Sequence, residues 1–194
     1  MKRKSDIRGF SLIELIIAMG VFAVLSVAIF GGVSYINAGK TKKASNTLNS
    51  KLTFIQTETM TKKGNMYLYV YKKDDGIYTC NLGTEVTGDA NGFLTRAELD
   101  TYLAGHDAGT KICDSKVTIT GKGSSSLTLT DSNMLKIGYS KSTGAFTYSN
   151  DGSLAADGTL HNKEFLSRLE LTGKETFYIK MIKSTGKHYI EKPQ

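Results

Sequence analysis

Residues 87–98 carry oxygen ligands at spacings that suit a calcium-binding loop of about twelve residues. Asp89 and Asn91 stand at the third and fifth positions of the loop, the carbonyl of Phe93 at the seventh, and Glu98 at the twelfth. These are the hard oxygen ligands that Ca²⁺ prefers. Thr87 stands at the first position, where Asp is expected, and no clear helix precedes the loop. The alternative is an Asx turn that leads into a short helix, with Glu98 serving as part of the helix cap.

Glu14 is the single charged residue between positions 10 and 39. A carboxylate in an apolar environment costs several kcal/mol unless it is paired. Because this segment has no Lys or Arg, the partner must come from another chain or from a new amino terminus. Cleavage after Gly9 would place the α-amine of Phe10 about one helical turn from Glu14. The amine of a neighbouring subunit could also reach Glu14 if the chains pack in parallel with an axial offset.

Catalysis finds no support in the sequence. The histidines His106, His161 and His188 lie in unrelated contexts with no nucleophile motif nearby. The chain has no phosphate-binding loop, no paired-carboxylate signature and no nucleophile elbow. We therefore predict a protein that is not an enzyme.

The charge of the chain is concentrated at its start. The 194 residues carry a formal charge of +7 and are 40 % hydrophobic, which suits one compact domain with an appendage and excludes a disordered chain. Residues 1–9 contribute +3 of this charge. The apolar stretch that follows is longer than the about 20 residues that a membrane-spanning helix needs, and the positive-inside rule places its basic end in the cytoplasm. Lys40, Lys42 and Lys43 depart from that rule. A secretory signal peptide would have a shorter apolar region without an acid.

Residues 8–15, Arg-Gly-Phe-Ser-Leu-Ile-Glu-Leu, closely resemble the prepilin cleavage motif of type IV pilins and of the pseudopilins of type II secretion and competence systems. The resemblance to this class III prepilin-like signal covers roughly residues 2–35. It implies that a prepilin peptidase cuts after Gly9 and methylates Phe10. It also implies that Glu14, the fifth residue of the mature chain, supports assembly.

The resemblance implies a structural subunit of a type IV pilus that assembles through its N-terminal helix with other pilin subunits. The alternatives are a pseudopilin of a type II secretion or competence (DNA uptake) machine, or a tip-located minor pilin that acts as an adhesion or binding module. In each case the precursor is expected in the cytoplasmic membrane, with its N-terminus inside, and the mature chain in an extracellular or periplasmic filament. No cofactor is expected, and calcium in the loop described above is the alternative.

Gly31 and Gly32 stand near the position where many major pilins have a proline in the middle of this helix. Two glycines cost about 1 kcal/mol each relative to alanine in a helix, so the pair could make the helix flexible there. The alternative is that small residues allow close packing of helices in a membrane.

The resemblance predicts an α+β, pilin-like fold in which one long helix packs on an antiparallel β-sheet head. We divide the chain into a leader at 1–9, a transmembrane or assembly half of the helix at 10–39, an amphipathic half at 40–64 and a globular β-rich head at 65–194. Apolar positions of the amphipathic half recur every three or four residues; they are Ala44, Leu48, Leu52, Ile55 and Thr59.

After Gly64 the pattern changes to the period of two that is typical of strands. The predicted strands are 66–72, 77–80, 116–120, 126–130, 134–139, 145–149, 176–183 and 187–190. A capping box predicts a helix at 95–104. Residues 162–169 form a second candidate helix, although 168–172 could equally be a strand.

Cys80 and Cys113 are the only cysteines, and the expected topology places both outside the cytoplasmic membrane, where disulfides persist. Members of the family that the chain resembles often carry such a pair in the head, so we expect a disulfide between Cys80 and Cys113. Two free thiols are the alternative. A metal site with His106, Asp107 and Asp114 is a weaker one, because the spacing matches no established zinc pattern.

The region 172–192 is basic, with aromatic residues between its lysines. Such a pattern could contact DNA, but lysines on a strand edge also block unwanted pairing. DNA is therefore an alternative partner, and nothing in the sequence favours it over a solvated strand edge.

Overall fold

The computed structural model describes residues 11–62, 64–83, 94–106, 109–123, 125–150 and 165–192, with backbone only for 27–38, 148 and 150. The chain divides into two compact units, Met1–Asn37 and Ala38–Gln194. Helix α1 (Leu12–Thr61) contributes residues to both units. We describe each unit by itself.

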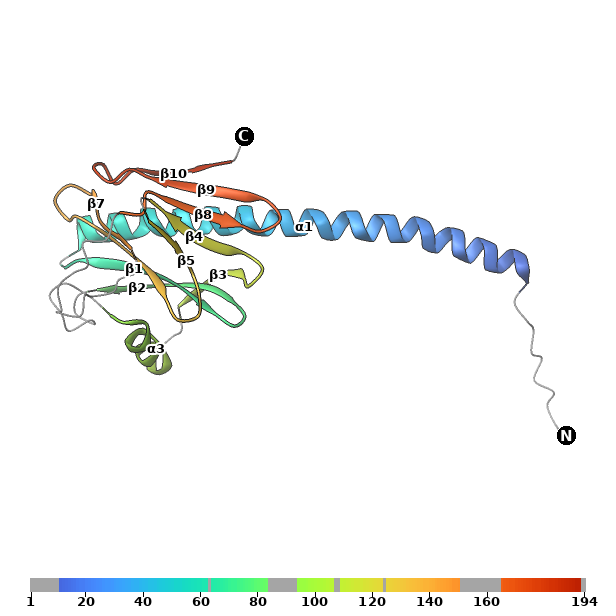
Figure 1. Ribbon diagram of the computed structural model, residues 1–194, viewed down its shortest axis with the longest axis horizontal. Coiled ribbons are helices and arrows are strands. Elements are labelled where there is room, and N and C mark those ends of the chain that lie inside the picture. Colours follow the sequence, from blue (N-terminus) through green and yellow to red (C-terminus); the bar gives the residue numbers. More distant parts are fainter. Residues whose placement is uncertain are drawn as a thin grey trace. The chain divides into compact units, whose positions relative to one another are not determined.

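The second unit contains two antiparallel sheets of five strands each (Figure 1). Sheet A has the order β3-β2-β1-β6-β7. Its strands are β1 (Met66–Lys73), β2 (Gly76–Gly83), β3 (Thr110–Asp114), β6 (Met134–Tyr139) and β7 (Phe146–Asn150). Sheet B has the order β10-β9-β8-β4-β5. Its strands are β4 (Thr118–Lys122), β5 (Ser126–Thr128), β8 (Arg168–Thr172), β9 (Thr176–Met181) and β10 (His188–Glu191). The α+β class is therefore confirmed.

The expectation of one sheet is wrong. Turn signals predict which neighbouring strands form hairpins, but not where a hairpin joins a sheet. Here β4 pairs with β8, from Thr118↔Thr172 to Lys122↔Arg168, and this long-range pairing makes a separate sheet. Strand β3 was not predicted, because it has no alternation of polar and apolar residues. Residues 168–172 form strand β8 and not the end of a helix, while 162–164 lie outside the described residues.

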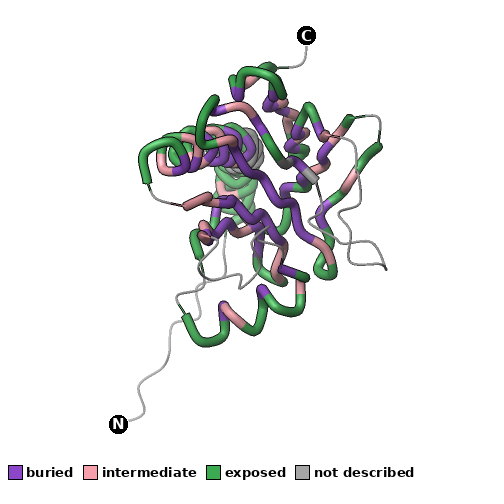
Figure 2. Tube along the Cα trace, turned by 90° about the vertical axis from the view of Figure 1, so that its left-hand side faces the viewer, coloured by how far each residue is buried: buried purple, intermediate pink, exposed green. Residues whose placement is uncertain are grey.

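The amphipathic part of α1 packs against both sheets. All five predicted apolar-face positions, from Ala44 to Thr59, are fully buried. The cluster that contains Leu48 and Leu52 also includes Leu68 of sheet A and Ile179 of sheet B. Buried positions of α1 and of the central strands lie in the interior of this unit (Figure 2). One core therefore joins the helix to both sheets.

Sheet A has a second buried face. Helix α3 (Arg96–Gly105) places Leu99 and Leu103 against Tyr67 and Tyr69 of β1, on the face opposite to α1 (Figure 1). Lys136 of β6 is also fully buried, with its ammonium 4.1 Å from the centre of the Tyr67 ring. The alternating pattern of β1 therefore reflects two cores rather than one core and one solvent face.

The C-terminal end of α1 is fixed by two loops. The side-chain amide of Gln56 donates hydrogen bonds to the carbonyl oxygens of Gly144 (2.8 Å) and Gly186 (3.4 Å). Gly186 has a φ of +68°, and a Cβ atom there would lie 1.8 Å from the Gly144 carbonyl oxygen. Only glycine fits at this close approach.

His188 connects three elements at the same place. Its Nε2 lies 3.0 Å from the hydroxyl of Thr53 in α1, and its Nδ1 lies 3.4 Å from the hydroxyl of Tyr139 in β6. Burial lowers the pKa of His188, although backbone hydrogen bonds, including one to Gly186, oppose this effect. The imidazole is therefore part of the packed structure, and its burial favours the neutral form.

Candidate functional site

Ser11 and Glu14 form a reciprocal capping box at the first turn of α1. The backbone amide of Ser11 donates to Glu14 Oε2 (2.9 Å), and the backbone amide of Glu14 donates to Ser11 Oγ (3.3 Å). This pair satisfies two amides that have no partner within the helix. This capping box was not predicted, although Ser followed three residues later by Glu is its sequence signature.

The first unit exposes an almost continuous series of large apolar side chains. In the isolated chain each has an exposed fraction between 50 % and 78 %. They are Leu12, Ile13, Leu15, Ile16, Ile17, Met19, Val21, Phe22, Val24 and Leu25. Such a distribution has no polar face, unlike an amphipathic surface helix.

Within the part of the chain that the structure describes, no helix is both long enough and apolar enough to cross a membrane.

The predicted processing site lies outside the described residues, whereas the glycine pair lies within α1. Gly9 and Phe10 lie outside the described residues, so cleavage and methylation remain predictions. The backbone of α1 is continuously helical through Gly31 and Gly32. Flexibility at these glycines within an assembly therefore also remains a prediction.

Residues 4–30 match the family model described as the prokaryotic N-terminal methylation motif. The chain carries a prepilin-type N-terminal signal. The predicted resemblance to the signal of type IV pilins and pseudopilins is thereby confirmed. The prepilin-type signal supports a type IV pilin-like or pseudopilin protein and implies processing by a prepilin peptidase. Searches of curated proteins and of solved structures found no significant match.

The structure does not contain the expected disulfide between Cys80 and Cys113, since both residues are free cysteines. Cys113 pairs with Ile77 and belongs to the core that faces α1. Cys80 belongs to the cluster under α3, on the opposite face of sheet A. Two cysteines on opposite faces of one sheet cannot form the bond without movement of the backbone.

Both thiols are held in the protonated form. Burial raises the pKa of Cys80 to about 12 and that of Cys113 to about 11. The alternative of two free thiols therefore fits the structure. No cluster of three or more His, Cys, Asp or Glu side chains occurs among the described residues, and Asp107 of the weaker metal alternative lies outside them.

The calcium prediction concerns a segment that is only partly described. Asp89, Asn91 and Phe93 lie outside the described residues. Glu98 is the third residue of α3, where its carboxylate accepts hydrogen bonds from the backbone amide (2.6 Å) and hydroxyl (2.9 Å) of Thr95. The predicted capping role of Glu98 is confirmed, and calcium binding by the loop remains the untested alternative.

The basic C-terminal residues do not form one continuous surface. Lys180 and Tyr189 are cross-strand partners on the solvent face of sheet B. Lys174 lies in the connection between β8 and β9, and Lys183 and Lys187 lie between β9 and β10. The basic residues opposite Lys180 come instead from β8 and β4, which the sequence analysis did not connect with this region.

Proposed function

We propose that the chain is the structural subunit of a type IV pilus-like filament. It is made as a prepilin, cleaved after Gly9 and methylated at Phe10. The N-terminal half of its helix holds the precursor in the cytoplasmic membrane and later packs in the filament. The mature subunit has a pilin-like fold, in which α1 packs on a β-rich head.

One observation carries this proposal. The prepilin-type signal includes the first turns of a helix whose large apolar side chains are exposed at most positions from Leu12 to Leu25. Exposed apolar surface of this extent in an isolated chain requires an apolar partner. Lipid is that partner for the precursor, and the helices of neighbouring subunits replace lipid in the filament.

Glu14 would guide this assembly by its charge. Within residues 10–39 it has no basic partner, and the α-amine of a neighbour's Phe10 supplies the missing cation after cleavage. Ser11 holds the carboxylate at the start of the helix in the isolated chain. Assembly would place the amine against a carboxylate whose position is already defined, so less side-chain entropy is lost.

Filament shearing tests the proposal in the cell that makes the protein. We expect the wild-type chain to dominate the sheared fraction and Gly9→Val to be absent from it, since a β-branched residue at the cleavage position blocks processing. Asp6→Asn, which changes the leader but not the cleavage position, is the matched control and should behave as wild type. Equal amounts of wild type and Gly9→Val in the sheared fraction would contradict the proposal.

The same measurement separates the alternatives. A chain that is present only in trace amounts beside another dominant subunit is a minor pilin that acts at the tip. A chain that is processed but never recovered in long surface filaments is a pseudopilin.

A further inference from the structure

The solvent face of sheet B carries three cations at directly opposed positions on adjacent strands. Lys122 of β4 pairs with Arg168 of β8, and Arg168 pairs with Lys180 of β9. We call these three residues the cationic row. Neighbouring strands lie about 4.8 Å apart, so like charges in such a row repel one another and destabilise the sheet. An ion pair between Lys122 and Glu170 offsets part of this repulsion.

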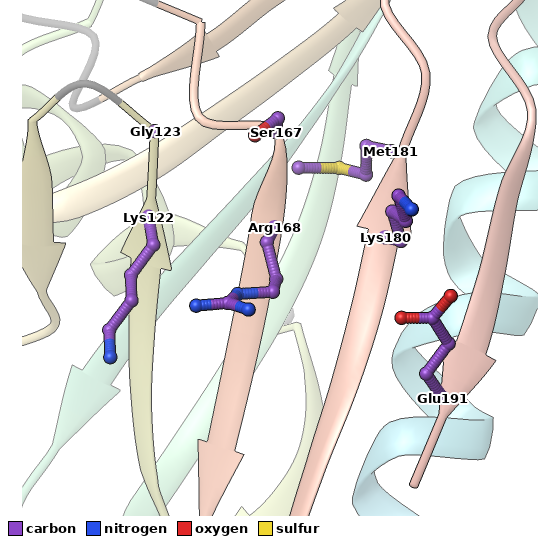
Figure 3. Close-up of a pocket in the computed structure, with 7 residues that line it drawn as sticks. All are labelled: Lys122, Gly123, Ser167, Arg168, Lys180, Met181 and Glu191. Carbon is purple, nitrogen blue, oxygen red and sulfur yellow. The ribbon is translucent and has the colours of Figure 1, made fainter. Parts of the chain in front are cut away.

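The cationic row lines a pocket on the sheet (Figure 3). The pocket has a volume of about 260 Å³, and the guanidinium of Arg168 is directed toward the side of Lys122 (Figure 3). Glu191 of β10 lines the side next to Lys180 (Figure 3). The pocket therefore combines cations on three strands with one carboxylate.

A second row with different chemistry runs beside the first. Glu170, Tyr178 and Glu191 are register partners on β8, β9 and β10. They stand two residues from the cationic row along β8 and β9, at a distance of about 7 Å. We call these three residues the acceptor row, because they offer two carboxylates and one aromatic ring.

Contacts connect the two rows. Lys122 forms an ion pair with Glu170. The guanidinium carbon of Arg168 lies 4.8 Å from the centre of the Tyr178 ring. The ammonium of Lys180 lies 5.9 Å from the centre of the Tyr189 ring, which is itself 38 % exposed. The cations are thus held over aromatic rings at the protein surface.

We propose that this face of sheet B binds single-stranded nucleic acid across its strands. The phosphates lie along the cationic row, and the bases lie beside it, over the exposed ring of Tyr189 and against the exposed carboxylate of Glu191. Aromatic rings stack on bases, and carboxylates accept hydrogen bonds from exocyclic amines such as that of cytosine. A polymer with phosphates on one edge and flat, amine-bearing groups on the other matches both rows.

Other anionic polymers match only one row. An acidic polysaccharide would satisfy the cations, but its sugar rings are not planar aromatic groups, and the carboxylates of the acceptor row would repel its charges. A nucleic-acid duplex hides the faces of its bases. The inference goes beyond the filament role and does not depend on it.

Fluorescence anisotropy of labelled oligodeoxycytidine of about a dozen nucleotides, titrated with the full chain in non-ionic detergent, tests the proposal. The triple variant Lys122→Gln, Arg168→Gln and Lys180→Gln should lower the affinity at low salt by at least about tenfold. It should also reduce the slope of log K against log salt by about 2, which corresponds to three lost phosphate contacts. The melting temperature should change little, because the relief of repulsion within the row offsets the loss of the ion pair between Lys122 and Glu170.

The matched control removes the same charge elsewhere. The triple variant Lys116→Gln, Lys141→Gln and Lys174→Gln changes three exposed lysines outside the pocket, and its affinity should fall less than about twofold. An equal loss in both triple variants would overturn the proposal, since binding would then follow net charge alone. If the row variant fails to fold, Lys180→Gln alone should reduce the slope by about 0.7, and an unchanged slope would overturn the proposal.

Base preference provides the second test. We expect oligodeoxycytidine to bind more tightly than oligothymidine, and we expect Glu191→Ala to remove this preference while the melting temperature stays constant. Tyr189→Ala should weaken both oligonucleotides by about tenfold. Equal or tighter binding of a polyuronate or of a blunt DNA duplex would overturn the proposal in favour of a general polyanion site.

Discussion

Glu14 Oε2 lies 2.9 Å from the backbone nitrogen of Ser11, and the hydroxyl oxygen of Ser11 lies 3.3 Å from the backbone nitrogen of Glu14. The carboxylate that we propose for assembly is therefore also the cap of its own helix. These two roles use different properties of the side chain. The cap needs a hydrogen-bond acceptor, whereas pairing with the Phe10 amine of a neighbour needs a negative charge.

Glu14→Gln separates the two roles, because Gln keeps the capping acceptor and removes the charge. We expect Glu14→Gln and Glu14→Ala to insert in the membrane and to be cleaved, and both to fail to form filaments. Immunoblots of sheared filaments and of membranes provide the measurement. If Glu14→Gln assembles normally while Glu14→Ala does not, Glu14 acts only as a cap and the charge-pairing account is wrong.

His188 should make the head less stable in mild acid. Burial lowers its pKa below the ordinary value of 6.5, so the unfolded chain takes up a proton before the folded chain does. The contribution of neutral His188 to the free energy of unfolding is therefore fully present above about pH 7. This contribution decreases as the pH drops below 6.5. The carboxyl groups of Asp75 and Asp114 have lowered pKa values because of hydrogen bonds to Lys111 and Lys40, and they act only at more acidic pH.

Chemical unfolding of the full chain in detergent, followed by tyrosine fluorescence, measures this effect. His188→Gln is the control, and its stability should change less than that of wild type between about pH 7.5 and pH 5.5. An identical pH dependence in wild type and His188→Gln would show that another group controls it.

Thr95 and Glu98 form the capping box of α3, and Glu98 is also the last residue of the calcium loop considered at 87–98. Thr95→Ala removes the capping hydroxyl and should lower the stability by about 1 kcal/mol, whereas Thr95→Ser should preserve most of it.

Because Glu98 already accepts hydrogen bonds from Thr95, we expect a calcium chelator to leave the melting temperature of the wild type unchanged. A lower melting temperature with chelator, restored by added Ca²⁺, would establish the calcium site at residues 87–98.

Substitutions at Leu48 and Phe54 test how much the packing of α1 on the head contributes to stability. Leu48 is fully buried between the helix and the sheets, whereas Phe54 on the same helix is 49 % exposed. Leu48→Ala should cost about 2–5 kcal/mol through the cavity that it leaves. Phe54→Ala should cost less than about 1 kcal/mol. Similar losses in the two variants, measured by denaturant unfolding, would contradict the observed packing.

The long helix and most strands could be predicted because their patterns are local. The positions from Ala44 to Thr59 follow the helical period, and the capping box at Thr95 identifies the start of α3. The prepilin-type signal could also be identified from the sequence, because its residues are consecutive. By contrast, β4 pairs not only with the neighbouring β5 but also with β8, some fifty residues later, and no local pattern encodes that second pairing.

The wrong prediction of a disulfide and the missed cationic row have the same physical origin. The separation of Cys80 and Cys113 depends on which face of sheet A each side chain occupies, and a bulge between β2 and β3 shifts that register. The cationic row joins Lys122, Arg168 and Lys180 from strands that are distant in sequence. Spacing along the chain cannot reveal either arrangement until the register of the strands is known.

Mass spectrometry of the mature N-terminus tests the central claim most directly. The chain should be purified from cells that contain a prepilin peptidase and digested, and its N-terminal peptide should be sequenced. The account predicts a peptide that begins at Phe10 and carries one methyl group on its α-amine. An N-terminus that still begins with Met1, or a cut near residue 35, would contradict the prepilin-type processing on which the proposed function rests.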